Sequence, residues 1–113
     1  FSTVMQISFK VPGLQSLREI WKLAETRGAT NIRGLNHGNA ISVYMLDPEG
    51  NTVEVYLDTP FYIAQPHGDP LDLSKSDDEI FSETEEVCRK DPTFQLLEDW
   101  QADFLKKSAG ADR

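Results

Sequence analysis

Residues 36–57 are the most informative stretch of this chain, because they hold one of its two histidines together with a tyrosine and a glutamate that could take part in chemistry. Two β-rich runs flank an Asp-Pro-Glu-Gly-Asn turn at residues 47–51, where proline and glycine favour a chain reversal, so this stretch is predicted to be a β-hairpin. His37 precedes the hairpin, and Tyr44 and Glu54 lie within it. An imidazole can transfer protons, a phenol can donate a hydrogen bond and a carboxylate can bind a cation. By residue type alone, Glu54 is also typical of an exposed strand carboxylate and His37 of a loop hydrogen-bonder.

The alternation of polar and apolar residues assigns these groups to one face of a sheet, because successive strand residues point to opposite sides. The polar face of the hairpin carries Ser42, Tyr44, Thr52, Glu54 and Tyr56, and the apolar face carries Ile41, Val43, Met45, Val53, Val55 and Leu57. Near the N-terminus, Met5, Ile7, Phe9 and Val11 alternate in the same way with Gln6, Ser8 and Lys10. The sheet is therefore predicted to have one apolar and one functional face.

A helix is predicted between these strands. Its apolar residues recur at helical spacing between Pro12-Gly13 and Gly28: Leu14, Leu17, Ile20, Trp21 and Ala24. This helix would cover the apolar face of the sheet. Residues 30–35 are a shorter, mixed segment that could form a further strand, which gives the order β, α, β, β, β.

That order, with the Asp-Pro-Glu-Gly-Asn-Thr-Val-Glu run at residues 47–54, resembles a module of the vicinal oxygen chelate superfamily. The superfamily includes glyoxalases, extradiol ring-cleaving dioxygenases and bleomycin or fosfomycin resistance proteins. The resemblance covers about residues 4–58 and implies an α+β fold, a βαβββ module of the glyoxalase/extradiol dioxygenase fold with a helical C-terminal extension. Glu54 occupies the position of the metal-binding glutamate on the last strand of such modules.

The resemblance is greatest to the extradiol dioxygenases, in which a histidine precedes the hairpin and a tyrosine lies on its first strand. His37 and Tyr44 match those two positions, as an acid/base group and a donor to the substrate. The resemblance implies a catechol-type aromatic substrate, O2 and Fe(II) or another divalent metal held by two histidines and a carboxylate. This chain has Gln6 where the first strand normally carries a histidine ligand, so Gln6 is a weak ligand or a relic.

Two other functions are open at this point. A metal-free binding protein of the bleomycin-resistance type would use the same polar face to hold an aromatic or hydrophobic molecule, and Gln6 in place of histidine favours it. A glyoxalase-like lyase would use glutamine as a ligand but would leave His37 and Tyr44 unexplained. Ser8 and Asn39 are further candidates to line the cavity, and His67 is predicted to lie on the surface outside the site.

Residues 59–113 are predicted to form a C-terminal extension with two helices, beside the module at residues 1–58. Ser76 and Glu79 form a capping box for the first helix, which should end before Asp91-Pro92. Its predicted inner face carries Ile80, Phe81, Thr84, Val87 and Cys88, and a second amphipathic helix carries Phe94, Leu97, Trp100 and Phe104. The runs Tyr-Leu-Asp-Thr-Pro-Phe-Tyr and Asp-Pro-Leu-Asp-Leu-Ser resemble the extension of some dioxygenase-like members. We expect the aromatic stripe to pack on the sheet edge or on a second chain.

Composition and charge limit the partners of this chain. Its formal net charge is -8, which disfavours nucleic acid and anionic membranes because both require cationic contacts. It has no apolar run long enough for a membrane span. The single Cys88 cannot form an internal disulfide, in keeping with a cytoplasmic location. Because the chain starts at Phe1, directly before a predicted strand, we expect a fragment that pairs with a second βαβββ module or forms a homo-oligomer.

Overall fold

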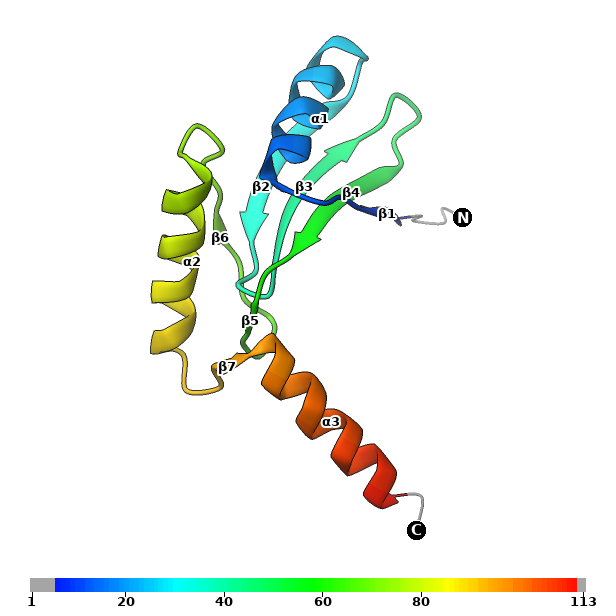
Figure 1. The fold of residues 1–113 in the computed structure, drawn as a ribbon. Coiled ribbons are helices and arrows are strands. Elements are labelled where there is room, and N and C mark those ends of the chain that lie inside the picture. Colours follow the sequence, from blue (N-terminus) through cyan, green and yellow to red (C-terminus); the bar gives the residue numbers. More distant parts are fainter. Residues whose placement is uncertain (1–5, 112–113) are drawn as a thin grey trace.

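The computed structural model describes residues 6–111, so the expectation for Met5 lies outside the described residues. These residues form an α+β fold with a mixed sheet of five strands (Figure 1). The first half of the fold consists of β1 (Gln6–Lys10), α1 (Leu14–Thr26), β2 (Thr30–Asn36), β3 (Ala40–Leu46) and β4 (Thr52–Asp58). This is the predicted order β, α, β, β, β, and the mixed segment at residues 30–35 is a strand.

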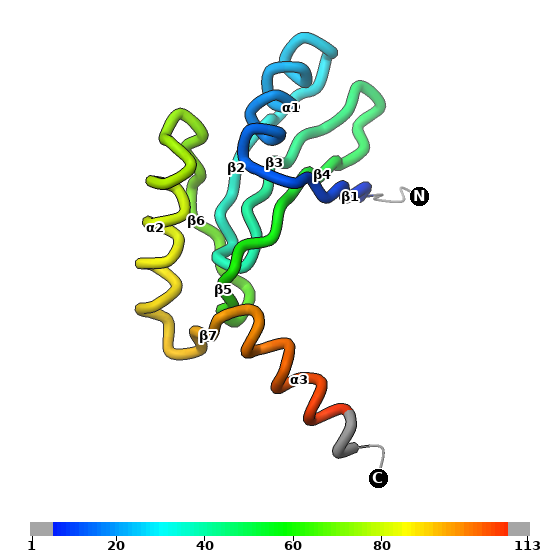
Figure 2. The backbone as a smooth tube through the Cα atoms, in the orientation of Figure 1, coloured from blue at the N-terminus to red at the C-terminus, as the bar shows by residue number. Residues whose placement is uncertain are grey.

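The second half adds β5 (Phe61–Tyr62), β6 (Asp69–Pro70), α2 (Asp77–Lys90), β7 (Gln95–Leu96) and α3 (Leu97–Ala111). Strands follow the order β1-β4-β3-β2-β6 in the main sheet, and β5 pairs with β7 in a second sheet. Only β1 and β4 run parallel among these neighbours. The chain thus returns after residue 60 to place β6 beside β2 (Figure 2). Over residues 6–111, no helix is long and apolar enough to cross a membrane.

The predicted hairpin is confirmed. Its turn is held by the carboxylate of Asp47, which accepts hydrogen bonds from the backbone N–H groups of Glu49 at 2.9 Å and Asn51 at 2.8 Å. These hydrogen bonds, the one from Asn51 first, hold the pKa of Asp47 below its ordinary value. Gly50 has φ of 85°, which an L-residue adopts only with strain. The turn fixes the register in which Tyr44 of β3 lies opposite Glu54 of β4.

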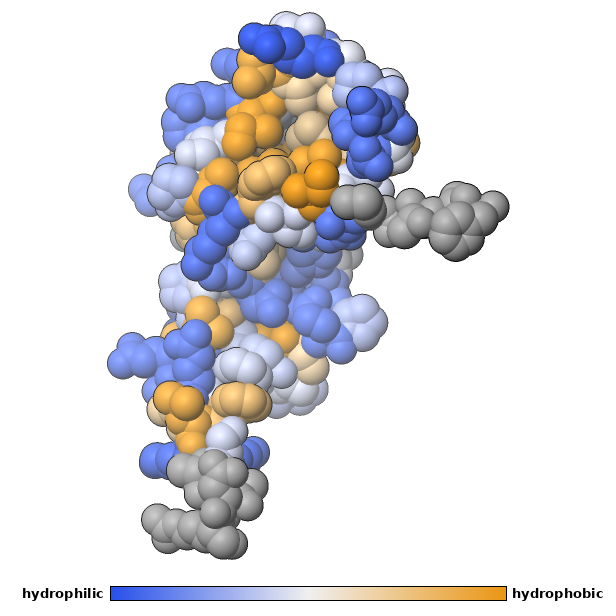
Figure 3. All heavy atoms as spheres, turned by 90° about the vertical axis from the view of Figure 1, so that its right-hand side faces the viewer, coloured by the Kyte–Doolittle hydropathy of each residue, from blue (hydrophilic) through white to orange (hydrophobic). Residues whose placement is uncertain are grey.

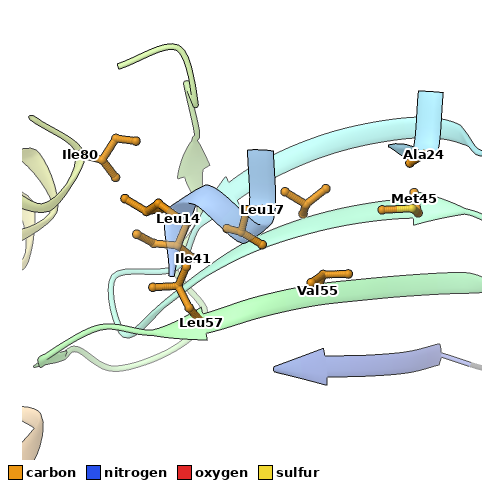
Figure 4. Close-up of a cluster of buried hydrophobic side chains, with 9 residues drawn as sticks. Leu14, Leu17, Ala24, Ile41, Met45, Val55, Leu57 and Ile80 are labelled. Carbon is orange, nitrogen blue, oxygen red and sulfur yellow. The ribbon is translucent and has the colours of Figure 1, made fainter. Parts of the chain in front are cut away.

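The main core lies between α1 and the apolar face of the sheet (Figure 4). Leu14 and Leu17 of α1 are almost completely buried there, as the helical spacing predicts. The sheet contributes Ile41, Val43, Met45, Val55 and Leu57 to this cluster, and α2 contributes Ile80. Burial of these side chains is the main stabilising term that holds the sheet in place, and with it the opposite, polar face.

Strand β1 differs from the expectation for a covered apolar face. Ile7 is 37% and Phe9 is 55% exposed, although both point to the apolar side. The reason is the position of β1 at the edge of the sheet, next to β4 only, while α1 contacts β2, β3 and β4. The alternation predicts the direction of these side chains but not which strand the helix leaves uncovered.

The C-terminal helices follow the predicted signals in part. Ser76 caps α2 by accepting a hydrogen bond from the backbone N–H of Glu79 at 3.2 Å, which confirms the predicted start of the helix, and α2 ends at Lys90. The Glu79 carboxylate accepts from the Ser76 hydroxyl at 3.1 Å, so the second hydrogen bond of the predicted capping box goes to the side chain of Ser76. The inner face of α2 buries Ile80, Thr84 and Cys88, whereas Val87 is 41% exposed. The last helix begins at Leu97 rather than near Phe94, because residues 95–96 pair with β5 as a short strand.

Candidate functional site

The polar face of the sheet brings three of the predicted site residues together. In the register of the strands, Ser8 of β1 and Tyr44 of β3 both lie opposite Glu54 of β4. Gln6 lies two residues before Ser8 on β1 and therefore points to the same side. The alternation of polar and apolar residues along the strands is sufficient to assign these four side chains to one face. Their mutual contact follows from β1 being the direct neighbour of β4.

Glu54 is the centre of this polar cluster, and each of its carboxylate oxygens accepts two hydrogen bonds. Oε1 accepts from Gln6 Nε2 at 3.2 Å and from Ser8 Oγ at 3.0 Å. Oε2 accepts from Ser42 Oγ at 3.0 Å and from Tyr44 Oη at 2.8 Å. Four donors from two strands, β1 and β3, therefore hold the carboxylate in one orientation.

His37 is joined to Glu54 through Tyr44. Its Nε2 lies 2.9 Å from Tyr44 Oη, and its Nδ1 lies 2.8 Å from the carbonyl oxygen of His67. A carbonyl only accepts hydrogen bonds, so Nδ1 carries a proton and Nε2 faces Tyr44. The two rings meet edge to face, with centroids 6.0 Å apart. The result is a continuous chain of hydrogen bonds from a loop imidazole through a phenol to a strand carboxylate.

This chain can hold and transfer a proton. The hydroxyl of Tyr44 has one proton and two neighbours that can accept it, Glu54 Oε2 and an unprotonated Nε2 of His37. A proton that first binds Nε2 makes His37 an imidazolium, which can donate to Tyr44 Oη while the tyrosine proton moves toward Glu54. The arrangement suits general acid/base chemistry next to a fixed negative charge.

Burial raises the pKa of the Tyr44 phenol above its ordinary value of 10.0, and the hydrogen bond to Glu54 raises it further. A hydrogen bond with Ser42 and the charge of Arg33 act in the opposite direction. The phenol therefore stays protonated, and able to donate to Glu54, through the neutral pH range.

Replacing Tyr44 by phenylalanine is expected to cost about 1 kcal/mol of unfolding free energy near neutral pH, because one hydrogen bond is lost. A raised folded-state pKa gives a stabilising contribution that is complete below pH 10.0 and is lost as the pH rises through the folded-state value. The difference in unfolding free energy between wild type and Tyr44→Phe should therefore decrease as the pH rises above 10.0. Urea unfolding across this range measures it, and a difference that stays constant contradicts the argument.

Three residues near the site were given no role by the sequence argument. Ser42 is fully buried beneath the polar face and contacts Glu54 directly. Arg33 of β2 places its guanidinium carbon 5.3 Å from the centre of the Tyr44 ring, a cation–π contact. His67 takes part through its backbone carbonyl, while its imidazole lies 2.9 Å from Asp69. The alternation of residues along β3 assigns Ser42 to the polar face, but no local pattern indicates the contacts of Arg33 and His67.

The two further cavity candidates have different positions. Ser8 belongs to the Glu54 cluster, since its hydroxyl donates to Oε1. Asn39 instead accepts a hydrogen bond from Gln65 Nε2 at 3.2 Å, in the loop after β5. Asn39 thus has a structural partner of its own among the described residues.

The Glu54 cluster lacks most of the ligands that an Fe(II) site of this type requires. Within residues 6–111 no group of three or more His, Cys, Asp and Glu side chains could hold a metal ion. Glu54 is one carboxylate ligand, and Gln6 turns its amide nitrogen toward it. Both ring nitrogens of His37 have other partners. The residues described here therefore do not supply the two imidazoles and one carboxylate of a non-haem Fe(II) centre.

Comparisons of the chain with protein family models, with curated proteins and with solved structures find no match. The likeness to the vicinal oxygen chelate superfamily consequently depends on the residues and the element order alone. The geometry of the site is independent of that likeness.

Proposed function

We propose that this chain is a vicinal oxygen chelate module of the extradiol dioxygenase type, acting on a small catechol-type aromatic molecule and O2. The observation that carries the proposal is the hydrogen-bonded chain His37–Tyr44–Glu54. The resemblance assigns these three positions to acid/base catalysis, substrate contact and metal binding. Their side chains come from a loop and two strands and meet on one face of the sheet. The order β1-α1-β2-β3-β4 supports the same assignment.

The proposed metal site needs residues beyond those described. Glu54 would be the carboxylate ligand, and Gln6 would bind weakly through its amide oxygen or not at all. The missing imidazoles would come from a second βαβββ module or a second copy of the chain. Fe(II) is the metal that the resemblance implies, and another divalent cation is compatible with the same oxygen ligands.

The residues of this chain have separate roles in the proposal. Tyr44 would turn its hydroxyl proton from Glu54 toward an oxygen of the bound aromatic molecule, and its raised pKa keeps that proton on the phenol at neutral pH. His37 has one ring nitrogen fixed by the His67 carbonyl, so its other nitrogen is presented in a constant direction. That nitrogen would take up or return a proton through Tyr44.

The test is metal content and ring cleavage after anaerobic reconstitution with Fe(II), with a catechol panel and the yellow cleavage product as readout. Glu54→Gln should reduce both by about 100-fold or more, because the negative ligand is lost while the shape is kept. Glu49→Gln, an equal change at an exposed turn position, is the control and should leave both unchanged. Wild-type protein that holds no Fe(II) and cleaves no catechol would reject the dioxygenase proposal.

A metal-free binding protein is the second candidate, and one observation favours it. Both oxygens of Glu54 already accept hydrogen bonds from four side chains, so the carboxylate is satisfied without a cation. In that case the polar face would bind an aromatic ligand through Tyr44 and Arg33. Calorimetric titration with catechols in the presence of EDTA separates the two functions. Binding that is unchanged by the chelator, without ring cleavage in Fe(II), supports this candidate.

A further inference from the structure

The last helix, α3, projects away from the rest of the molecule (Figures 1 and 2). Its main contacts are with β5 and β7, and the backbone N–H of Leu97 donates to the carbonyl of Pro60 at its start. The radius of gyration is 16.3 Å, whereas about 13 Å is expected for a compact domain of this length. Most of α3 therefore has no layer of the fold to pack on among the described residues.

An aromatic ladder runs from the body onto this helix. Tyr62 of β5 stacks on Trp100 with ring centroids 4.6 Å apart, and Trp100 stacks on Phe104 at 5.6 Å. Phe104 remains 56% exposed, and apolar residues are visible on the lower part of the molecule in Figure 3. A groove of about 340 Å³ beside the ladder is lined by Tyr62, Thr93, Gln95, Trp100, Asp103, Phe104 and Lys107. An exposed aromatic groove of this kind is typical of an interface.

Charged residues on the groove side of α3 indicate what kind of molecule binds in the groove. Asp103 and Lys107 both line the groove, one turn apart, and neither is within 4.0 Å of an opposite charge in the described part of the chain. On α2 the same spacing does produce ion pairs, Glu85 with Arg89 at 2.7 Å and Glu86 with Lys90 at 3.3 Å. The first half of α3 is acidic, with Glu98, Asp99 and Asp103, and the second half is basic, with Lys106 and Lys107.

We propose that α3 is the docking surface for a second copy of this chain. The two α3 helices lie side by side and antiparallel, each in the groove of the other. In this arrangement Asp103 faces the partner's Lys107, and Lys107 faces the partner's Asp103, so one surface is complementary to itself about a two-fold axis. A parallel pair would place like charges together. The proposal does not depend on the catalytic function proposed above.

The test is a charge exchange on the 113-residue chain, with molar mass measured by light scattering and sedimentation. Wild type should be a dimer. Asp103→Lys and Lys107→Asp should each weaken dimerisation by about tenfold or more, because like charges then meet. An equimolar mixture of these two variants should form heterodimers, and the double variant Asp103→Lys/Lys107→Asp should dimerise as wild type does.

Lys106→Asp is the matched control, since it makes the same change at the neighbouring residue, about 100° around the helix. It should leave the dimerisation constant within about threefold of wild type. Circular dichroism checks that each variant keeps its helix content. A monomeric wild-type chain overturns the proposal, as does an equal effect of Lys106→Asp and Lys107→Asp. Failure of the mixed variants to pair overturns the antiparallel arrangement.

Discussion

Replacing Gly38 by alanine is expected to lower the free energy of unfolding by roughly 2–5 kcal/mol. Gly38 has φ of 81°, in the left-handed region that costs an L-residue about 1–2 kcal/mol. An added Cβ would also lie 2.5 Å from Cδ1 of Ile63 and 3.2 Å from Sγ of Cys88. Both neighbours are completely buried, so the clash adds an overpacking cost of about 1–3 kcal/mol.

Urea unfolding followed by circular dichroism measures this loss, and Gly50→Ala is its control. Gly50 has a similar φ of 85°, but an added Cβ meets nothing within 4 Å. Gly50→Ala should therefore lower the free energy of unfolding only by the cost of a positive φ in alanine, about 1–2 kcal/mol. Equal losses for the two variants would show that contact with Ile63 is not the cause. Because Gly38 follows His37, Gly38→Ala should also displace the imidazole from Tyr44.

Replacing Leu17 by alanine is the second large effect, with an expected loss of about 2–5 kcal/mol. Leu17 is fully buried between α1 and the sheet, so its removal leaves a cavity as well as losing apolar contact. Alanine has a helix propensity at least as favourable as that of leucine. The loss would thus report packing against the sheet rather than weaker helix formation.

Leu23→Ala on the same helix is the matched comparison, because Leu23 is 53% exposed. It should change the free energy of unfolding by less than about 1 kcal/mol. Denaturant unfolding of both variants gives the contrast. Similar losses at the two positions would mean that α1 does not use its Leu17 side as the inner face.

Much of the fold could be predicted because its signals are local. The hairpin turn, the Ser76 cap of α2 and the spacing of Leu14 and Leu17 each depend on residues a few positions apart, and each is confirmed. Long-range pairing has no such signal. The two residues of β6 pair with β2 across a long stretch of chain, and β1 lies at the edge of the sheet, and no local pattern specifies either position.

In the candidate site, too, some features follow from local sequence patterns and others depend on long-range contacts. Alternation along the strands is a local property, so Gln6, Tyr44 and Glu54 could be assigned to one face before their distances were known. The hydrogen bond between His37 and Tyr44 joins a loop to a strand, and Arg33 reaches Tyr44 from a strand whose sequence is mixed. Such contacts require the three-dimensional arrangement of loop and strand, which residue spacing does not encode.

The bond between His37 and the loop before β6 has a consequence for how this protein can vary. The acceptor is the main-chain carbonyl of His67, which every amino acid possesses. Substitutions at position 67 can therefore accumulate without releasing the imidazole, provided that the backbone path is kept. An insertion or deletion between β5 and β6 would move that carbonyl. The C-terminal segment is thus tied to the histidine by its length and path more than by its composition.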